Sequence, residues 1–151
     1  MSRKKEWYMD IATHAFIKYA FLGCPTRDER EKQIRQECYK KFALKNPSFI
    51  AIKADEAVAK KRGELKDIDT VNRVLDILKK QDKQHIIDAV RAVYFYDPHG
   101  KPERGVIINR VRRFAYEYPA NERTVYKWLK SVRLLFAQIR ELDTGGNDER
   151  W

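Results

Sequence analysis

The sequence contains few of the residues that support disulfide scaffolds or turn-rich β structure. Its 151 residues include two cysteines, six glycines and five prolines. Cys24 and Cys38 are too few for a disulfide framework, and we expect both to be free thiols in a reducing compartment. Low glycine and proline contents favour long helices over many short strands and turns. We therefore predict an all-α fold.

Long apolar runs are also missing. No stretch reaches the roughly 18 apolar residues that a helix needs to cross a bilayer. The first ten residues, MSRKKEWYMD, are followed by neither the apolar segment nor the small-residue cleavage site of a signal peptide. These absences predict a cytoplasmic protein that does not act at a membrane.

Motifs for catalysis and metal binding are absent as well. His14, His85 and His99 do not combine with the cysteines in a spacing typical of zinc sites. The sequence has no glycine-rich phosphate loop and no G-x-S-x-G nucleophile motif. We therefore predict no metal, no cofactor and no enzymatic activity.

What the chain does have is a substantial apolar content and an excess of positive charge. Hydrophobic residues make up 43% of the sequence, enough to bury a core. The 32 Lys and Arg residues outnumber the 22 Asp and Glu residues, giving a formal net charge of +10. A basic chain of this size often binds a polyanion, and nucleic acid and anionic membrane are the main candidates. A lysine-rich surface that only aids solubility is the alternative.

Apolar residues at helical spacing predict a first helix over residues 7–22. Gly23 and Pro25 should end it, because glycine suits a C-terminal cap and proline cannot continue a helix. Its aromatic residues could stack on unpaired bases, but helical spacing favours core packing or a dimer interface. These aromatic residues are Trp7, Tyr8, Phe16, Tyr19 and Phe21.

Capping residues mark the next helices. Thr26 or Asp28 can open a helix that continues through residue 44, and Asn46–Pro47 marks the start of another that should end near Gly63. Helical periodicity then resumes over residues 67–80.

Asp67 and Asp69 are expected as caps or first-turn acids of this next helix. A further helix is predicted within residues 81–98. Residues 97–105 contain two prolines and two glycines, which predict a loop.

These boundaries suggest three regions. Residues 1–63 form an N-terminal helical bundle for contacts with a partner or a second copy. Residues 64–143 form a helix-turn-helix module, and residues 144–151 form a flexible tail. The loop at 97–105 leads into the last two helices of the module.

The last two helices are predicted over residues 106–118 and from Asn121 onward, with Pro119 between them. Asn121 can cap the second helix, and Glu122 suits its first turn. The apolar positions of this second helix repeat with helical spacing for about five turns, so we assign them to the core. They are Val125, Trp128, Leu129, Val132, Leu135, Phe136, Ile139 and Leu142.

The opposite side of the same helix is basic. No acidic residue occurs between Glu122 and Glu141. Residues 101–140 contain ten basic and three acidic residues, so this segment carries +7 of the net charge of +10. Leu134 is the apolar exception on this side, and Arg133 lies at its flank.

Two helices joined by a tight turn, with the second basic on its outer side, predict a DNA-binding helix-turn-helix. Arginine and lysine suit guanine edges and asparagine suits adenine, whereas other arginines can grip the phosphate backbone. The candidate base contacts are Asn121, Glu122, Arg123, Tyr126, Lys127 and Lys130. The candidate phosphate contacts are Arg104, Arg110, Arg112, Arg113 and Arg133. A solvated basic hairpin would show the same periodicity.

The stretch ERTVYKWLKSVRLLFAQIR resembles the DNA-reading helix of sigma-70 region 4-like domains. The wider run over residues 85–130 is similar to the C-terminal part of phage-encoded late-gene regulators of the ArpU/RinA type. The resemblance covers about the second half of the chain. It implies DNA contacts from Arg123, Thr124, Tyr126, Lys127 and Lys130.

Thr124 falls at the edge of the apolar stripe, so we expect it to form a local hydrogen bond or to contact a phosphate. The first half of the chain does not match the promoter-melting region of a complete sigma factor. This difference favours an accessory regulator over an autonomous sigma factor.

The sequence therefore predicts a transcriptional regulator that binds double-stranded DNA, with RNA polymerase or a second copy as the partner of the N-terminal helices. A phage small terminase-like protein that recognises packaging sites is one alternative, although such proteins usually carry this motif near the N-terminus. A helical interaction protein that does not bind DNA is the other alternative.

Overall fold

The computed structural model describes residues 7–95 and 103–142, and all of its regular structure is helical. The helices are α1 (Trp7–Phe21), α2 (Arg27–Lys41), α3 (Pro47–Lys60), α4 (Arg62–Lys80), α5 (Gln84–Tyr94), α6 (Arg104–Glu117) and α7 (Glu122–Arg140). No strand occurs in the described ranges, which confirms the all-α prediction. None of these described helices has the length and apolar content required to span a membrane.

The predicted tail at 144–151 and most of the predicted loop at 97–105 lie outside the described residues. Both therefore stay predictions.

The ends of the first helices follow the capping signals in the sequence. Gly23, which follows α1, adopts a φ of +89°, a backbone conformation that residues with a side chain rarely adopt. Thr26 and Glu29 form a reciprocal capping box at the start of α2. At α3, the Asn46 side chain accepts a 2.8 Å hydrogen bond from the backbone N–H of Phe49, and Pro47 occupies the first turn.

α4 begins earlier than the sequence pattern indicates. Gly63 lies inside its first turn instead of ending the preceding helix, and Asp67 and Asp69 lie within the helix instead of capping it. The burial of Leu65, which is only 1% exposed, favours extension of the helix. An internal glycine opposes that extension by only about 1 kcal/mol.

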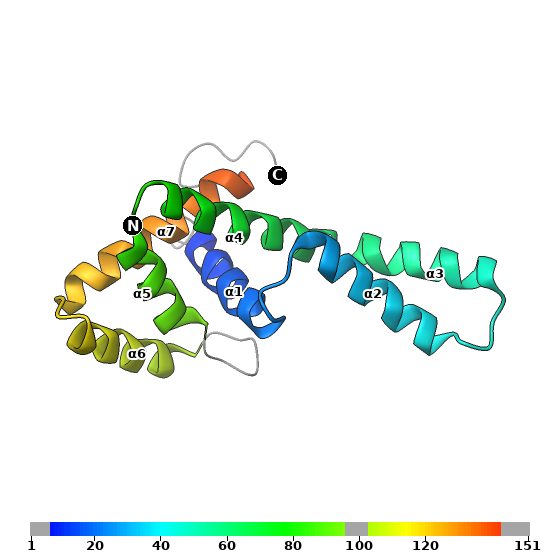
Figure 1. The fold of residues 1–151 in the computed structure, drawn as a ribbon, viewed down its shortest axis with the longest axis horizontal. Coiled ribbons are helices and arrows are strands. Elements are labelled where there is room, and N and C mark those ends of the chain that lie inside the picture. Colours follow the sequence, from blue (N-terminus) through cyan, green and yellow to red (C-terminus); the bar gives the residue numbers. More distant parts are fainter. Residues whose placement is uncertain (1–6, 96–102, 143–151) are drawn as a thin grey trace.

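Five helices, α1 and α4–α7, enclose one hydrophobic core, and we refer to them as the body (Figure 1). Phe16 of α1 lies near its centre, with its ring 6.0 Å from Tyr94 of α5 and 5.7 Å from Phe136 of α7. Tyr19 adds a 2.5 Å hydrogen bond to the Asn72 side chain of α4. Packing of α1 among the other helices therefore holds the body together.

Most aromatic residues of α1 are core residues, as the helical spacing predicts. Tyr8, Phe16 and Tyr19 are buried and are not available to stack on bases. Phe21, at the end of the helix, differs from them because it is 46% exposed.

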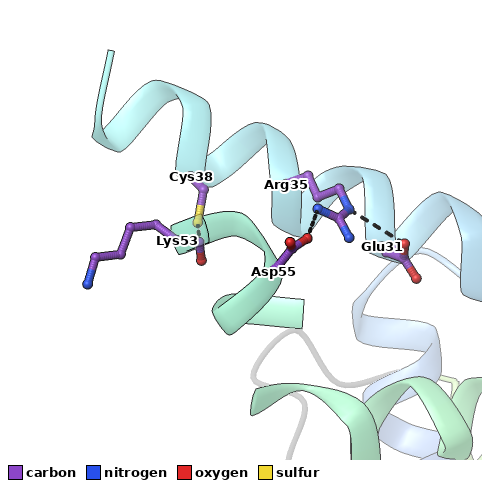
Figure 2. A network of polar contacts seen from close by, with 5 residues as sticks. All are labelled: Glu31, Arg35, Cys38, Lys53 and Asp55. Atoms are coloured by element: carbon purple, nitrogen blue, oxygen red, sulfur yellow. Dashed lines mark hydrogen bonds and ion pairs between the residues drawn. The ribbon is translucent and has the colours of Figure 1, made fainter. Parts of the chain in front are cut away.

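Helices α2 and α3 form a hairpin that projects from the body, and we call residues 27–60 the arm (Figure 1). Its buried apolar side chains are few, namely Ile34, Ile50 and Ala54. Polar contacts hold the two helices together as well (Figure 2). Arg35 of α2 pairs with Asp55 of α3 at 2.8 Å, and the Cys38 thiol donates to the Lys53 carbonyl at 3.6 Å.

Two ion pairs anchor the base of the arm to α4. Arg30 lies 2.8 Å from Glu64, and both side chains are largely buried. Arg27 lies 3.0 Å from Asp69 in a more exposed pair.

The packing divides the chain differently from the predicted boundary at residue 63. α1, which the sequence places in the region 1–63, packs in the same core as α4–α7. The reason is that α1 has fully buried residues on several sides, including Ala12, Phe16 and Ile17, and needs cover from more than one helix. The segment that stands apart is the arm.

Candidate nucleic-acid interface

A four-residue connection, residues 118–121, joins α6 to α7 and sets their relative direction. The backbone N–H groups of Tyr118 and Ala120 donate to carbonyls in the last turn of α6, at 2.8 and 2.9 Å. Asn121 then caps α7 by accepting a 2.7 Å hydrogen bond from the backbone N–H of Arg123. The tight turn and the Asn121 cap expected from the sequence are thus present.

The N-terminal half of α7 packs on α5 and α6. Val125 and Leu129 are buried in the core, with 0% and 2% of their surfaces exposed. The Trp128 ring lies 4.8 Å from His85 of α5 and 6.1 Å from Tyr118 at the end of α6. These contacts fix which side of α7 faces the core and which faces outward.

The C-terminal half of α7 is held by α1 and α4. Phe136 contacts Phe16, and the Arg140 guanidinium donates to Asp67 of α4 at 2.9 Å. Burial raises the pKa of Asp67 above its usual value, and the hydrogen bond from Arg140 partly opposes this rise. α7 is therefore anchored along its whole length and presents its outer side on a rigid support.

The outer face of α7, by which we mean Arg123, Tyr126, Lys127 and Lys130, is exposed to solvent. None of the ion pairs found among residues 7–95 and 103–142 involves its three cations. Tyr126 is 39% exposed beside them. Four base-contact candidates therefore share one accessible surface.

Two arginines of α6 form ion pairs with nearby acidic residues. Arg112 lies 3.7 Å from Glu122, and Arg113 lies 3.5 Å from Glu117. Each of these four side chains is more than half exposed, so both pairs contribute little to stability. Arg112 and Arg113 can leave these partners for a phosphate, whereas Arg123, Lys127 and Lys130 of α7 form no ion pair with any described residue.

Two residues predicted from the sequence to contact DNA, Arg110 and Asn121, have other roles in the fold, and a third, Arg133, is half-buried. The Arg110 guanidinium donates to the Ala92 carbonyl at 2.7 Å and ties α6 to α5. The Asn121 side-chain oxygen serves as the helix cap, so it is not free for a two-point contact with adenine. Arg133 is half-buried, and its Nε has no hydrogen-bond partner among the described residues.

Arg133 also affects a buried tyrosine of α5. Burial raises the pKa of the Tyr94 hydroxyl, and the positive charge of Arg133 opposes that rise. Arg133 is therefore less accessible to a phosphate than the exposed Arg112 and Arg113.

The remaining candidates, Arg104 and Thr124, lie outside the outer face of α7. Arg104 is exposed at the first position of α6, and Thr124 is half-buried beside the core stripe, as its place on the helix predicts. Tyr116, which is 89% exposed, is not among the residues predicted from the sequence. Its position on the side of α6 opposite Val111 and Phe114 could have identified it.

Nothing in the described ranges assembles a metal site: no three His, Cys, Asp or Glu side chains come together there. No protein-family model, curated protein or solved structure matches the chain.

Proposed function

We propose that the protein is a transcriptional regulator that binds double-stranded DNA, with α7 as the helix that reads the sequence. The observation that supports this most is the outer face of α7, where exposed cations without acidic partners lie on a helix anchored at both ends. A solvated helix face would usually mix charges of both signs, which stabilise a helix through pairs along it.

The chemistry of this surface suits duplex DNA. Arg123 lies in the first turn of α7, next to the connection from α6, where recognition helices make base contacts. Lys127 and Lys130 follow on the same side, and Arg123 and Lys127 can both bind guanine edges. The hydroxyl groups of Tyr116 and Tyr126 can donate to phosphates, which sets the position of the protein on the duplex.

The regulatory role rests on the resemblance to sigma-70 region 4-like domains. The α6–α7 pair comprises the residues that carry this resemblance, including TVYKWLK. In such a regulator the rest of the chain would contact RNA polymerase while α7 holds the target site.

The test begins with selection of a preferred duplex from a random library, followed by gel-shift titration. Replacing Arg123 and Lys127 with alanine should weaken binding to the selected duplex by about a hundredfold, since each base contact discriminates by about 1–3 kcal/mol. The control is Lys79→Ala with Lys83→Ala. These lysines are exposed around the α4–α5 turn, and their loss removes the same charge from another surface.

A second pair of substitutions separates phosphate contacts, which position the protein on the duplex, from base contacts, which recognise the sequence. Replacing Arg112 and Arg113 with alanine should weaken binding to selected and unrelated duplexes equally, because phosphate contacts carry no sequence information. If the wild-type protein binds no duplex at low salt, or if all three double variants bind alike, α7 is not a DNA-reading helix.

A further inference from the structure

The centre of the outer face of α7 consists of groups that donate hydrogen bonds and cannot accept them. Arg123, Lys127 and Lys130 follow one another at intervals of four and three residues, which places them on the same side of the helix. All three side chains are exposed. Guanidinium and ammonium groups have donors only, so any ligand of this surface must supply acceptors.

The acceptors nearest to this centre are engaged or lie at its margin. The Asn121 side-chain oxygen accepts the 2.7 Å hydrogen bond from the backbone N–H of Arg123. The Glu122 carboxylate lies 3.7 Å from Arg112 of α6. Tyr126, one turn after Glu122, adds a hydroxyl that can donate as well as accept. The middle of the face therefore differs from its margin, where acceptors occur.

A surface that only donates distinguishes the four bases in the major groove. Guanine presents two adjacent acceptors, O6 and N7, whereas adenine presents one acceptor beside an amino donor. Thymine presents one acceptor beside a methyl group, and cytosine presents an amino donor. An arginine or lysine can therefore make two hydrogen bonds to guanine alone. Adenine is matched by an amide side chain, and the amide of Asn121 is already used as the helix cap.

The length of the donor surface limits how many bases it can contact. Leu134, the next residue on this side after Lys130, is apolar and half-buried. The seven-residue interval from Arg123 to Lys130 corresponds to about 10 Å along the helix axis. That length matches about three steps between base pairs stacked about 3.4 Å apart. The surface thus reaches about four successive base pairs.

We propose that the outer face of α7 selects duplex sites in which two guanines occupy fixed positions within about four successive base pairs. Arg123 and Lys127 each donate to O6 and N7 of one of these guanines in the major groove. They are the principal readers because recognition helices contact bases with their N-terminal turns. This inference rests on the proposed DNA-binding function and specifies the ligand of the same surface.

The first test is a selection from a random duplex library, followed by base replacement in the selected site. The selection should recover a motif with two nearly invariant guanines within about four base pairs. Replacement of either guanine by 7-deazaguanine, which lacks the N7 acceptor, should weaken binding by about tenfold. Inosine keeps O6 and N7 and lacks only the amino group in the minor groove, so it should bind almost as well as guanine.

The second test assigns each guanine to one side chain. In Arg123→Ala, 7-deazaguanine at the position that Arg123 contacts should cost no further affinity, whereas the other position should keep its cost. Lys127→Ala should give the opposite pattern. Lys79→Ala removes one exposed charge from the end of α4 and should keep the wild-type sensitivity at both positions. Circular dichroism of each variant should match the wild type.

The outcomes separate this inference from the DNA binding on which it rests. A preferred site without fixed guanines, or an affinity that 7-deazaguanine does not change, would overturn the inference and leave DNA binding in place. The same holds if inosine weakens binding as much as 7-deazaguanine, because the contact would then lie in the minor groove. A wild-type chain that binds no duplex at low salt would reject both the inference and the proposed function.

Discussion

The body and the arm are both helical, but they are stabilised in different ways. The body surrounds a core of fully buried side chains, among them Phe16, Val90 and Phe136. The arm has three buried apolar side chains and depends on capping groups and ion pairs, including the largely buried pair of Arg30 and Glu64. Because burial of apolar surface dominates folding energetics, the body should be the more stable of the two.

This difference also bears on the proposed DNA-binding role of α7. The outer face of α7 lies on helices that enclose the hydrophobic core, which suits a surface that must hold side chains in register with DNA. The arm projects at the other end of the long axis from the α6–α7 connection (Figure 1).

The largest expected effect is the loss of stability that follows a substitution in the core of the body. Phe136→Ala removes a ring that packs 5.7 Å from Phe16 and should lower the free energy of unfolding by about 3–5 kcal/mol. Urea denaturation followed by circular dichroism measures this loss. Gln138→Ala, at an exposed position of the same helix, should change stability by less than about 0.5 kcal/mol.

A smaller and local effect is expected in the arm. Ile34→Ala creates a cavity in its small core and should destabilise the arm by about 2 kcal/mol without unfolding the body. Hydrogen exchange should then speed up within residues 27–60 and stay unchanged in α5 and α7. Equal acceleration throughout would mean that arm and body unfold together. Ile52→Ala, at a 59% exposed position of the arm, is the control.

Loss of a single cap should have a weaker effect. Thr26→Ala removes the acceptor for the backbone N–H of Glu29 and should cost about 1 kcal/mol of arm stability. Thr26→Ser keeps a hydroxyl acceptor and should recover most of that loss. Local hydrogen exchange in the first turns of α2 distinguishes the two variants, and identical exchange in both would exclude a stabilising cap.

The smallest effect is a pH dependence of the same cap. Hydrogen bonds from the backbone and side chain of Thr26 lower the pKa of Glu29 below its usual value. A carboxyl group with a lowered folded-state pKa stabilises the folded state above its unfolded-state pKa, and this contribution is lost as the pH falls through the folded-state value. The protection factors of the α2 amides, which are corrected for the intrinsic pH dependence of exchange, should therefore fall on acidification, and Glu29→Gln should remove the part due to this group.

Local signals in the sequence predicted much of the fold. The capping residues Thr26, Asn46 and Asn121 mark true helix starts because each acts on its own first turn. The start of α4 was missed because burial of Leu65, a tertiary effect, outweighs the glycine at position 63. The place of α1 in the body was missed for the same reason, since the sequence does not show which helices cover it.

The candidate site was predictable where the helix itself orients the side chains. Lys127 and Lys130 are exposed because the apolar stripe of α7 faces the core. Arg110 was misassigned because its contact comes from α5, a neighbour that periodicity within one helix cannot reveal.

The salt dependence of duplex binding tests the central claim most directly. Fluorescence anisotropy with one labelled duplex gives the slope of log affinity against log salt for the wild type, Arg123→Ala with Lys127→Ala, and Lys79→Ala with Lys83→Ala. A cation that enters a groove of the duplex lies close to phosphates as well as to bases and displaces counterions, so each contributes up to about 0.9 to that slope. We predict weaker binding and a shallower slope for the α7 variant alone. Equal slopes in all three proteins, or equal losses in the two variants, would contradict a DNA-binding role for the outer face of α7.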